Sequence, residues 1–191
     1  MKVLAINGSA RKNGNTAILL NTVLDELKKE GIKTELLQMA GNPIQGCQAC
    51  YKCLEKKDFR CVMDNDSLND WIAKMRKADG ILLGSPTYFS DVSSGMRALI
   101  ERCGFVSRAN DYMLKRKVGA AVVAVRRAGG IPAFSSMNLF LTYMQMVMPG
   151  SSYWHVGLGR DIGDVKKDEE GIQTMKTLGE NMAWLLKKLN P

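Results

Sequence analysis

Two stretches of the sequence combine residue types that can do chemistry. The first, residues 8–16 (GSARKNGNT), mixes glycines, hydroxyls, amides and cations. It follows a short apolar run, residues 2–7, and precedes an amphipathic run, residues 17–30. We expect a buried strand and then a helix, so that free backbone N–H groups and the positive end of the helix dipole converge in the loop between them. This order predicts an anion-binding site.

The donors in this loop favour a terminal monophosphate. Ser9, Asn15 and Thr16 offer neutral donors, and Arg11 offers a charged one. The loop lacks the Gly-Lys-Ser/Thr ending of a Walker A loop and the Gly-x-Gly-x-x-Gly pattern of a dinucleotide loop. FMN is therefore the candidate ligand, and an ordinary turn between a strand and a helix is the alternative.

The second stretch contains four of the five cysteines: Cys47, Cys50, Cys53 and Cys61. Three cysteines at intervals of three wrap a loop around one centre, and a distant fourth closes the site, which is how proteins hold a [4Fe–4S] cluster. Structural zinc usually takes two separate Cys-x2-Cys knuckles, which this stretch lacks. A zinc site and a metal-free loop with four thiols are the alternatives.

Strands and helices are expected to alternate along the chain. The apolar patterns predict strands at residues 2–7, 33–38, 80–85, 118–125 and 152–158, and helices around residues 17–30, 68–75, 96–103, 134–148 and 172–189. The cysteines fall in a long irregular insert, residues 39–65, after the second strand. These elements predict one α/β domain over residues 1–191, a doubly wound sandwich whose five-stranded parallel sheet has the order 2-1-3-4-5.

Ligands in such a sheet bind beyond the carboxyl ends of the strands, near the point between the first and third strands where the strand order reverses. The loop after the third strand contains Pro86, Thr87, Tyr88, Phe89 and Ser90. Its aromatic side chains and its backbone donors suit the ring of a flavin. The loop after the fourth strand adds Arg126 and Gly129, which are expected to stabilise the charge of a reduced ring and to let the main chain approach it.

Residues 8–16 together with residues 85–89 resemble the NADPH-dependent FMN reductase group of flavodoxin-like proteins. The resemblance implies that Ser9, Arg11, Asn15 and Thr16 hold the FMN phosphate, with Asn13 at the loop tip, and that residues 86–90 border the ring. The cysteine segment is similar to the compact motif of iron–sulfur flavoproteins, which carry one cluster and one FMN per subunit and assemble as tetramers.

The resemblance therefore implies a flavin-dependent oxidoreductase. Single electrons would pass from a carrier such as ferredoxin through the cluster to FMN, and from FMN to a small acceptor such as a quinone, oxygen or peroxide. The cofactors carry this chemistry, so no catalytic side chain is expected. Two alternatives are a cluster-free NAD(P)H-dependent FMN or quinone reductase and a flavin-binding module whose thiols sense redox state.

The net charge and the apolar stretches of the chain limit its possible partners and location. The formal net charge is +8, but the basic residues are spread along the chain, which argues against a nucleic-acid partner. The absence of a long apolar stretch and of a signal peptide predicts a cytoplasmic protein without a membrane anchor. The apolar run at residues 134–148 predicts a subunit contact and hence a homo-oligomer, either a dimer or the tetramer that the resemblance implies. Cys103 is expected to be a core residue, and His155 a packed or edge residue of a strand instead of a catalyst.

Overall fold

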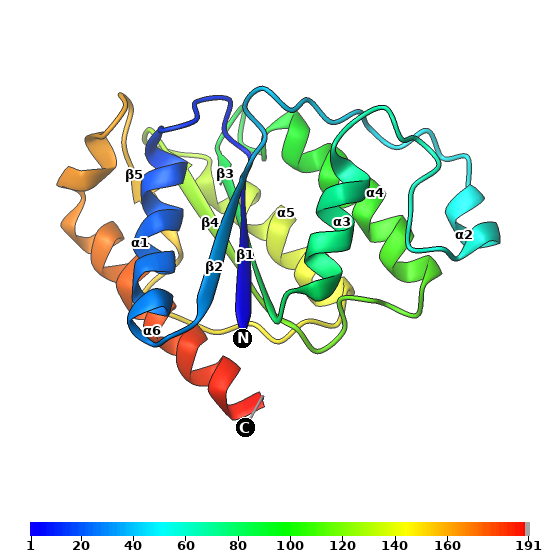
Figure 1. Ribbon diagram of the computed structural model, residues 1–191. Helices are drawn as coiled ribbons and strands as arrows, with labels where there is room; N and C mark the ends of the chain where they lie inside the picture. The colour runs from blue at the N-terminus through cyan, green and yellow to red at the C-terminus, as the bar shows by residue number, and fades with distance from the viewer. Residues whose placement is uncertain (190–191) are drawn as a thin grey trace.

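A parallel five-stranded sheet forms the centre of the computed structural model, which describes residues 1–189 (Figure 1). The strands are β1 (Lys2–Asn7), β2 (Lys33–Gln38), β3 (Gly80–Pro86), β4 (Val118–Val125) and β5 (Val156–Leu158). Their order is β2-β1-β3-β4-β5, and each neighbouring pair is parallel. The doubly wound topology predicted from the alternation of strands and helices is confirmed.

Helices cover both faces of the sheet (Figure 1). One face carries α1 (Asn15–Lys29) and α6 (Glu169–Leu189), and the other carries α3 (Leu68–Lys77), α4 (Ser94–Ala109) and α5 (Gly130–Tyr143). Two short helices, α2 (Lys52–Lys56) and the 3-10 turn η1 (Asp164–Lys167), lie in connecting segments. None of the helices within residues 1–189 has the length and apolarity that crossing a bilayer requires.

The core follows from side-chain alternation along the strands. In β1, Leu4 and Ile6 pack with the helices α3 to α5, whereas Val3 and Ala5 pack with α1 and α6. Every residue of β4 is buried, as its unbroken apolar sequence predicts for a strand covered on both faces. The sheet is therefore a rigid platform for the loops at its carboxyl edge.

Two predicted elements end at different places. The helix predicted at 134–148 runs from Gly130 to Tyr143, because Gln145 adopts a left-handed φ of 58° and the chain then turns. Val147 forms an isolated bridge with Val118. The strand predicted at 152–158 shortens to β5, because pairing with β4 begins only at His155, whose carbonyl accepts the Val123 N–H at 2.9 Å.

The cysteine insert leaves the sheet after β2 and crosses the ends of α3 and α4 at one side of the molecule (Figure 1). The sequence predicts an irregular insert, but the structure contains the five-residue helix α2 within it. None of the residues of α2 is buried. The insert therefore has no hydrophobic core of its own at α2, and its position depends on contacts with neighbouring helices.

Candidate functional site

A cleft with an empty volume of about 610 Å³ opens at the carboxyl ends of β1, β3 and β4. The cleft brings together most of the predicted cofactor residues: Ser9, Arg11, Asn15, Thr16, Pro86, Thr87, Tyr88 and Arg126. Three segments far apart in the sequence therefore meet where the strand order reverses.

The loop between β1 and α1 is fixed by its own hydrogen bonds. The buried Ser9 donates its N–H to Asn7 Oδ1 at 3.1 Å, and its hydroxyl accepts the Arg11 N–H at 3.0 Å. Within residues 1–189, the backbone N–H groups of Asn15 and Thr16, in the first turn of α1, have no acceptor. Free N–H groups at a helix N-terminus suit a phosphate.

Gly8 lies where the end of β1 closely approaches its neighbours. A Cβ at this position would lie 3.0 Å from the Gly84 carbonyl oxygen and 3.1 Å from Ser93 Oγ. The absence of a side chain at Gly8 therefore lets β1 end against β3 and α4.

A fourth loop also reaches the cleft, and sequence reasoning missed it. Gly159 and Arg160, directly after β5, line the cleft. Asn15 ties this loop to α1, because its Nδ2 donates to the Asp161 carbonyl and its Oδ1 accepts the Gly163 N–H, both at 2.9 Å. The predicted fifth strand could have indicated this loop, because the carboxyl ends of all parallel strands lie at the same edge of the sheet.

A tight hairpin follows β3. Tyr88 and Asp91 exchange backbone hydrogen bonds of 2.9 and 3.1 Å. Phe89 and Ser90 form the turn with left-handed φ values of 48° and 61°. Phe89 is fully exposed at the tip, so of the two predicted aromatics only Tyr88 lines the cleft.

Three other predicted residues also lie outside the lining. Asn13 is exposed at the tip of the first loop. Ser90 packs against Gly129, where a Cβ would lie 2.5 Å from Ser90 Oγ and where φ is +79°. Glycine at position 129 therefore lets the loops after β3 and β4 meet, because the backbone conformation and the close contact both disfavour a side chain.

Asp91 braces the hairpin against α4 and α5. Its carboxylate accepts hydrogen bonds from Arg97 Nη2 at 2.6 Å and from Ser136 Oγ at 2.8 Å. Burial raises the pKa of Asp91, but these bonds and one from the Val92 N–H lower it further, so the pKa lies below its ordinary value. The charged carboxylate holds Tyr88 at the edge of the cleft.

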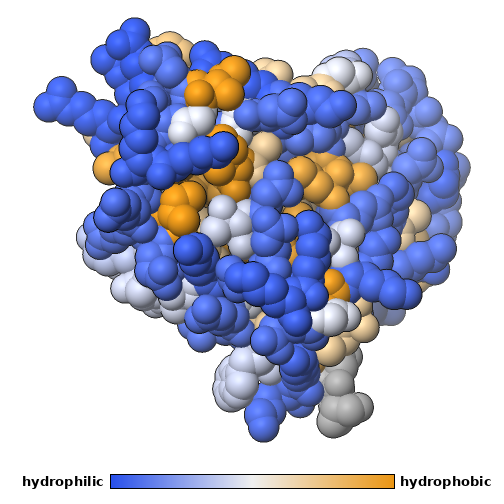
Figure 2. Space-filling model, turned by 60° about the vertical axis from the view of Figure 1, so that its left-hand side comes forward, coloured by the Kyte–Doolittle hydropathy of each residue, from blue (hydrophilic) through white to orange (hydrophobic). Residues whose placement is uncertain are grey.

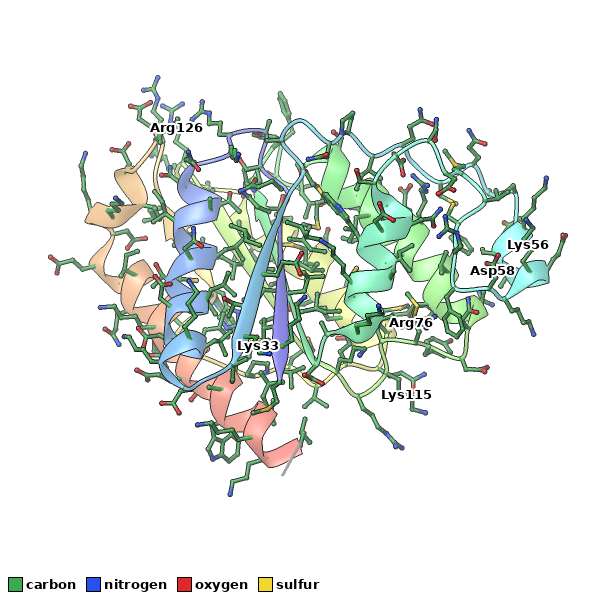
Figure 3. The ribbon with its side chains drawn as sticks, viewed as in Figure 1. Lys33, Lys56, Asp58, Arg76, Lys115 and Arg126 are labelled. Atoms are coloured by element: carbon green, nitrogen blue, oxygen red, sulfur yellow. The ribbon has the colours of Figure 1, made fainter. Side chains whose placement is uncertain are left out.

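The cleft offers polar groups that a ligand can satisfy. The buried Thr87 Oγ1 has no hydrogen-bond partner among the described residues, and Thr87 lines the cleft. Buried polar atoms normally have partners, so an unpaired hydroxyl in a cleft fits a polar ligand atom. Arg11, Arg126 and Arg160 add positive charge to the lining, and Arg126 lies at the upper edge of the molecule in Figure 3.

The four cysteines of the insert line one shared cavity. Ala49 and Tyr51, which alternate with Cys47, Cys50 and Cys53, have left-handed φ values of 50° and 56°. This conformation costs a non-glycine residue about 1–2 kcal/mol. Such backbone conformations persist where the surroundings enforce them, and they cluster at functional sites.

Helix α4 supports the first part of the insert. Glu101 Oε2 accepts the Cys47 N–H at 3.2 Å, and the rings of Tyr51 and Phe105 pack edge to face with their centroids 5.8 Å apart. The first cysteine and the turn before the third are thus held by side chains from one helix.

Asn69 on α3 holds the last cysteine. Its Oδ1 accepts the Cys61 N–H at 2.8 Å, and its Nδ2 donates to the Cys61 carbonyl at 2.9 Å. Asn69 is buried, and the periodicity of α3 alone does not reveal this role. A buried amide that satisfies both backbone groups of one residue fixes that residue firmly.

The thiols share the cavity without surrounding a single point. Within residues 1–189, no group of three or more His, Cys, Asp or Glu side chains is arranged to hold one metal ion. Burial raises the pKa of the Cys53 thiol, and the nearby Cys61 and Cys50 raise it further, against the effect of backbone hydrogen bonds. The raised pKa of Cys53 is thus due mainly to burial of its thiol, and the neighbouring sulfurs add to it.

The cleft and the cysteine cavity have no lining residue in common. In Figure 3, Arg126 lies at the cleft, whereas Lys56 and Asp58 project from the end of α2 at the opposite side of the molecule. The chain therefore presents two separate candidate sites.

Comparison with known proteins identifies the family. A model of the NADPH-dependent FMN reductase family matches residues 1–161. An iron–sulfur flavoprotein of Methanocaldococcus jannaschii is 35% identical over 194 residues, which cover 98% of this chain and 98% of that protein. The chain belongs to the iron–sulfur flavoprotein family. An iron–sulfur flavoprotein of Methanosarcina thermophila is 30% identical over 97% of this chain and 95% of its own length. Membership makes the protein a flavin-dependent oxidoreductase that uses FMN.

Solved structures share the fold. RosB, in a structure with a bound 8-demethyl-8-formylriboflavin-5′-phosphate intermediate, aligns with a TM-score of 0.76 at 18% identity, over 99% of this chain and 80% of RosB. An archaeal flavodoxin aligns with a TM-score of 0.63 at 15% identity, over 98% of this chain and 99% of its own. The predicted flavodoxin-like fold is confirmed.

Proposed function

We propose that this flavoprotein transfers single electrons through a [4Fe–4S] cluster held by Cys47, Cys50, Cys53 and Cys61. The electrons come from a carrier such as ferredoxin and pass by way of FMN to a small acceptor, such as a quinone, oxygen or peroxide. The observation that carries this proposal is the single cavity lined by all four cysteines. When bound, the cluster supplies one-electron chemistry, and FMN supplies one- and two-electron chemistry.

The arrangement of the thiols favours a cluster over zinc. With Zn–S bonds of about 2.3 Å, a tetrahedral zinc ion draws its sulfur ligands to within about 3.8 Å of one another. A cubane is bound through four separate irons, so its ligand sulfurs lie farther apart. The cysteines follow a Cys-x2-Cys-x2-Cys pattern with one distant fourth, instead of the two separate Cys-x2-Cys knuckles of structural zinc, which supports the second arrangement.

The protein's part at the flavin is to bind and orient it. Ser9, Arg11 and the free N–H groups at the start of α1 are suited to the phosphate, and Asn15 and Thr16 contribute from the first turn. The ring borders residues 86–88, where Tyr88 offers an apolar face and Thr87 an unpaired hydroxyl. Arg126 stabilises negative charge on the reduced ring.

Metal and flavin analysis of anaerobically purified protein tests this function. We expect about four irons and four sulfides for each FMN, and an absorption spectrum with a broad shoulder beneath the flavin bands. A clean flavin spectrum without iron or sulfide, in protein whose thiols are reduced and intact, would contradict the cluster.

A second candidate is direct reduction of FMN by NAD(P)H without a cluster. The matched family is described as NADPH-dependent, and a Bacillus subtilis relative, 25% identical over 93% of this chain and 96% of its own length, is named as a putative NAD(P)H-dependent FMN-containing oxidoreductase. Anaerobic mixing with NADPH distinguishes the two. Rapid bleaching of the flavin in a Cys61→Ala variant favours this candidate, whereas bleaching only by a one-electron carrier, and only in the intact protein, favours the first.

We further propose that copies of the chain assemble through α5. Leu139 and Tyr143 are 69% and 55% exposed on this helix, and both line a groove between α4 and α5. Apolar side chains gathered in this way commonly mark a subunit contact. Light scattering should report a mass above one chain, and Leu139→Lys should lower it; a wild-type monomer would exclude the assembly.

A further inference from the structure

Arg102 lies fully buried beneath the cysteine insert. Its side chain is 0% exposed, as is rare for a charged residue, and its carboxylate partner Asp66 is 4% exposed. Arg102 belongs to α4 and lines the same cavity as the four cysteines. A buried charge of this kind needs a full set of partners.

Each nitrogen of the guanidinium has a partner. Nη1 pairs with the Asp66 carboxylate and also donates to the Gln45 carbonyl at 3.2 Å. Nη2 donates to the Met63 carbonyl at 2.8 Å. Nε donates to Cys61 Sγ at 3.3 Å. Arg102 thus joins both ends of the insert to α4 and directs its remaining donor at one sulfur.

The sulfur partner of Nε indicates that Arg102 does more than join the insert to α4. A neutral thiol is a weak acceptor and gives little reason to place a buried guanidinium donor against it. A thiolate that binds a metal carries negative charge, and a hydrogen bond from a cation to such a group is among the stronger ones. Asp66 pairs with the far side of the guanidinium and limits the charge that the sulfur experiences.

We infer that Arg102 is a positioning residue that raises the reduction potential of the cluster through Cys61 Sγ, and that Asp66 limits this effect. The inference rests on the proposed cluster. Adding one electron makes a cluster and its sulfur ligands more negative, and a hydrogen bond to a ligand sulfur stabilises that charge. Because Arg102 contacts the sulfur and Asp66 contacts only Arg102, the positive end of the pair is the nearer one.

Potentiometric titration of the holoprotein, followed by electron paramagnetic resonance, tests the inference. In Arg102→Gln, we expect the one-electron reduction equilibrium to shift at least tenfold toward the oxidised form, which corresponds to about 59 mV. Asp66→Asn should shift the equilibrium the other way, because it leaves the positive charge uncompensated. Arg108→Gln is the matched control, since it removes the same charge from an exposed position on α4 outside the cysteine cavity.

The double variant Arg102→Gln/Asp66→Asn protects the test from misfolding, because it leaves no unpaired buried charge. It should also titrate at a lower potential than the wild type. Wild-type potentials in Arg102→Gln and in the double variant would overturn the inference, as would loss of iron from all three variants, which would make the pair purely structural. Absence of iron from the wild-type protein would instead overturn the proposed function.

Discussion

The flavin cleft and the cysteine cavity are positioned in different ways. Every loop at the cleft leaves the carboxyl end of a strand of the sheet, so the sheet itself sets the positions of these loops. The cysteine insert leaves the sheet after β2, and its geometry depends on three side chains from the helices: Asn69, Glu101 and Arg102. Backbone topology therefore determines one site, and side-chain contacts determine the other.

The surface is consistent with this division. On the face turned forward in Figure 2, hydrophilic side chains cover most of the molecule, and apolar ones gather in a few patches between them. Beneath the surface, β1 and β4, from which two loops of the cleft extend, are almost entirely buried. The cysteine residues, in contrast, are partly or fully exposed, apart from the core residue Cys103.

The largest expected effect separates the two sites. Cys47→Ala and Cys61→Ala should each abolish iron binding, because each removes a cluster ligand, and both should keep FMN, because the cleft is built elsewhere. Iron, sulfide and flavin content per chain measure this. Cys103→Ala is the control, since its thiol is buried in the core. Full iron in Cys61→Ala would contradict the ligand set, and loss of FMN would show that the sites depend on each other.

The second expected effect acts on the cleft alone. Arg11→Ala should weaken FMN binding about 10- to 150-fold, because a hydrogen bond to a charged group contributes about 1.5–3 kcal/mol. Fluorescence titration of the FMN-free protein gives the dissociation constant. The neighbouring Lys12→Ala should change it little, because Lys12 does not line the cleft. Equal affinities for wild type and Arg11→Ala would remove Arg11 from the phosphate site.

A third variant acts on the side-chain support of the insert. Asn69→Ala leaves the Cys61 N–H and carbonyl without their partner, which should destabilise the insert by about 1–3 kcal/mol. Hydrogen exchange of the metal-free protein should become faster around Cys61, with FMN affinity unchanged. Asn181→Ala, which removes one exposed bond to the Gly150 carbonyl, is the control. A matching loss of FMN affinity would mean that the insert supports the cleft.

The smallest expected effect concerns the sheet. His155 is buried, and its Nδ1–H donates a 2.9 Å hydrogen bond to the Ala121 carbonyl. Burial lowers the pKa of His155, and the hydrogen bond to Ala121 offsets only part of this effect. The pKa in the folded protein therefore lies below the pKa in the unfolded chain. The contribution of the neutral His155 side chain to the free energy of unfolding is therefore complete above pH 6.5. It is lost as the pH falls, by at most about 1.4 kcal/mol per pH unit.

Urea unfolding at pH 7.5 and 5.5 measures this dependence. His155 is the only histidine of the chain, so His155→Gln should flatten the profile in this range. The loss should appear in the unfolding of the sheet, with hydrogen exchange in the insert unaffected. An unchanged profile in His155→Gln would assign the dependence to another group.

Sequence patterns predict the parts of the molecule that repeat a simple periodicity. The strands follow from short apolar runs, and the cleft follows from the rule that ligands bind at the carboxyl ends of parallel strands. The predicted end of α5 was wrong, because nothing in the local sequence requires the left-handed φ of Gln145. The same holds for Ala49 and Tyr51, whose conformations only the folded insert enforces.

The role of Arg102 was also beyond sequence reasoning. Its neighbours on α4, Leu99 and Cys103, fit an apolar face, and a charged residue beside them reads as exposed. Its burial depends on Asp66 and on carbonyl groups that approach from the insert. Contacts that join distant segments leave no local pattern.

The bridge from Asn15 to the loop after β5 has a consequence for biosynthesis. The first loop of the chain is completed by residues 161 and 163, and α6 then packs along α1. A nascent polypeptide that has not yet left the ribosome tunnel lacks both supports. We therefore expect FMN to be captured only once residues 159–189 have left the ribosome tunnel, and ribosome-stalled chains that stop before Gly159 to be recovered without flavin.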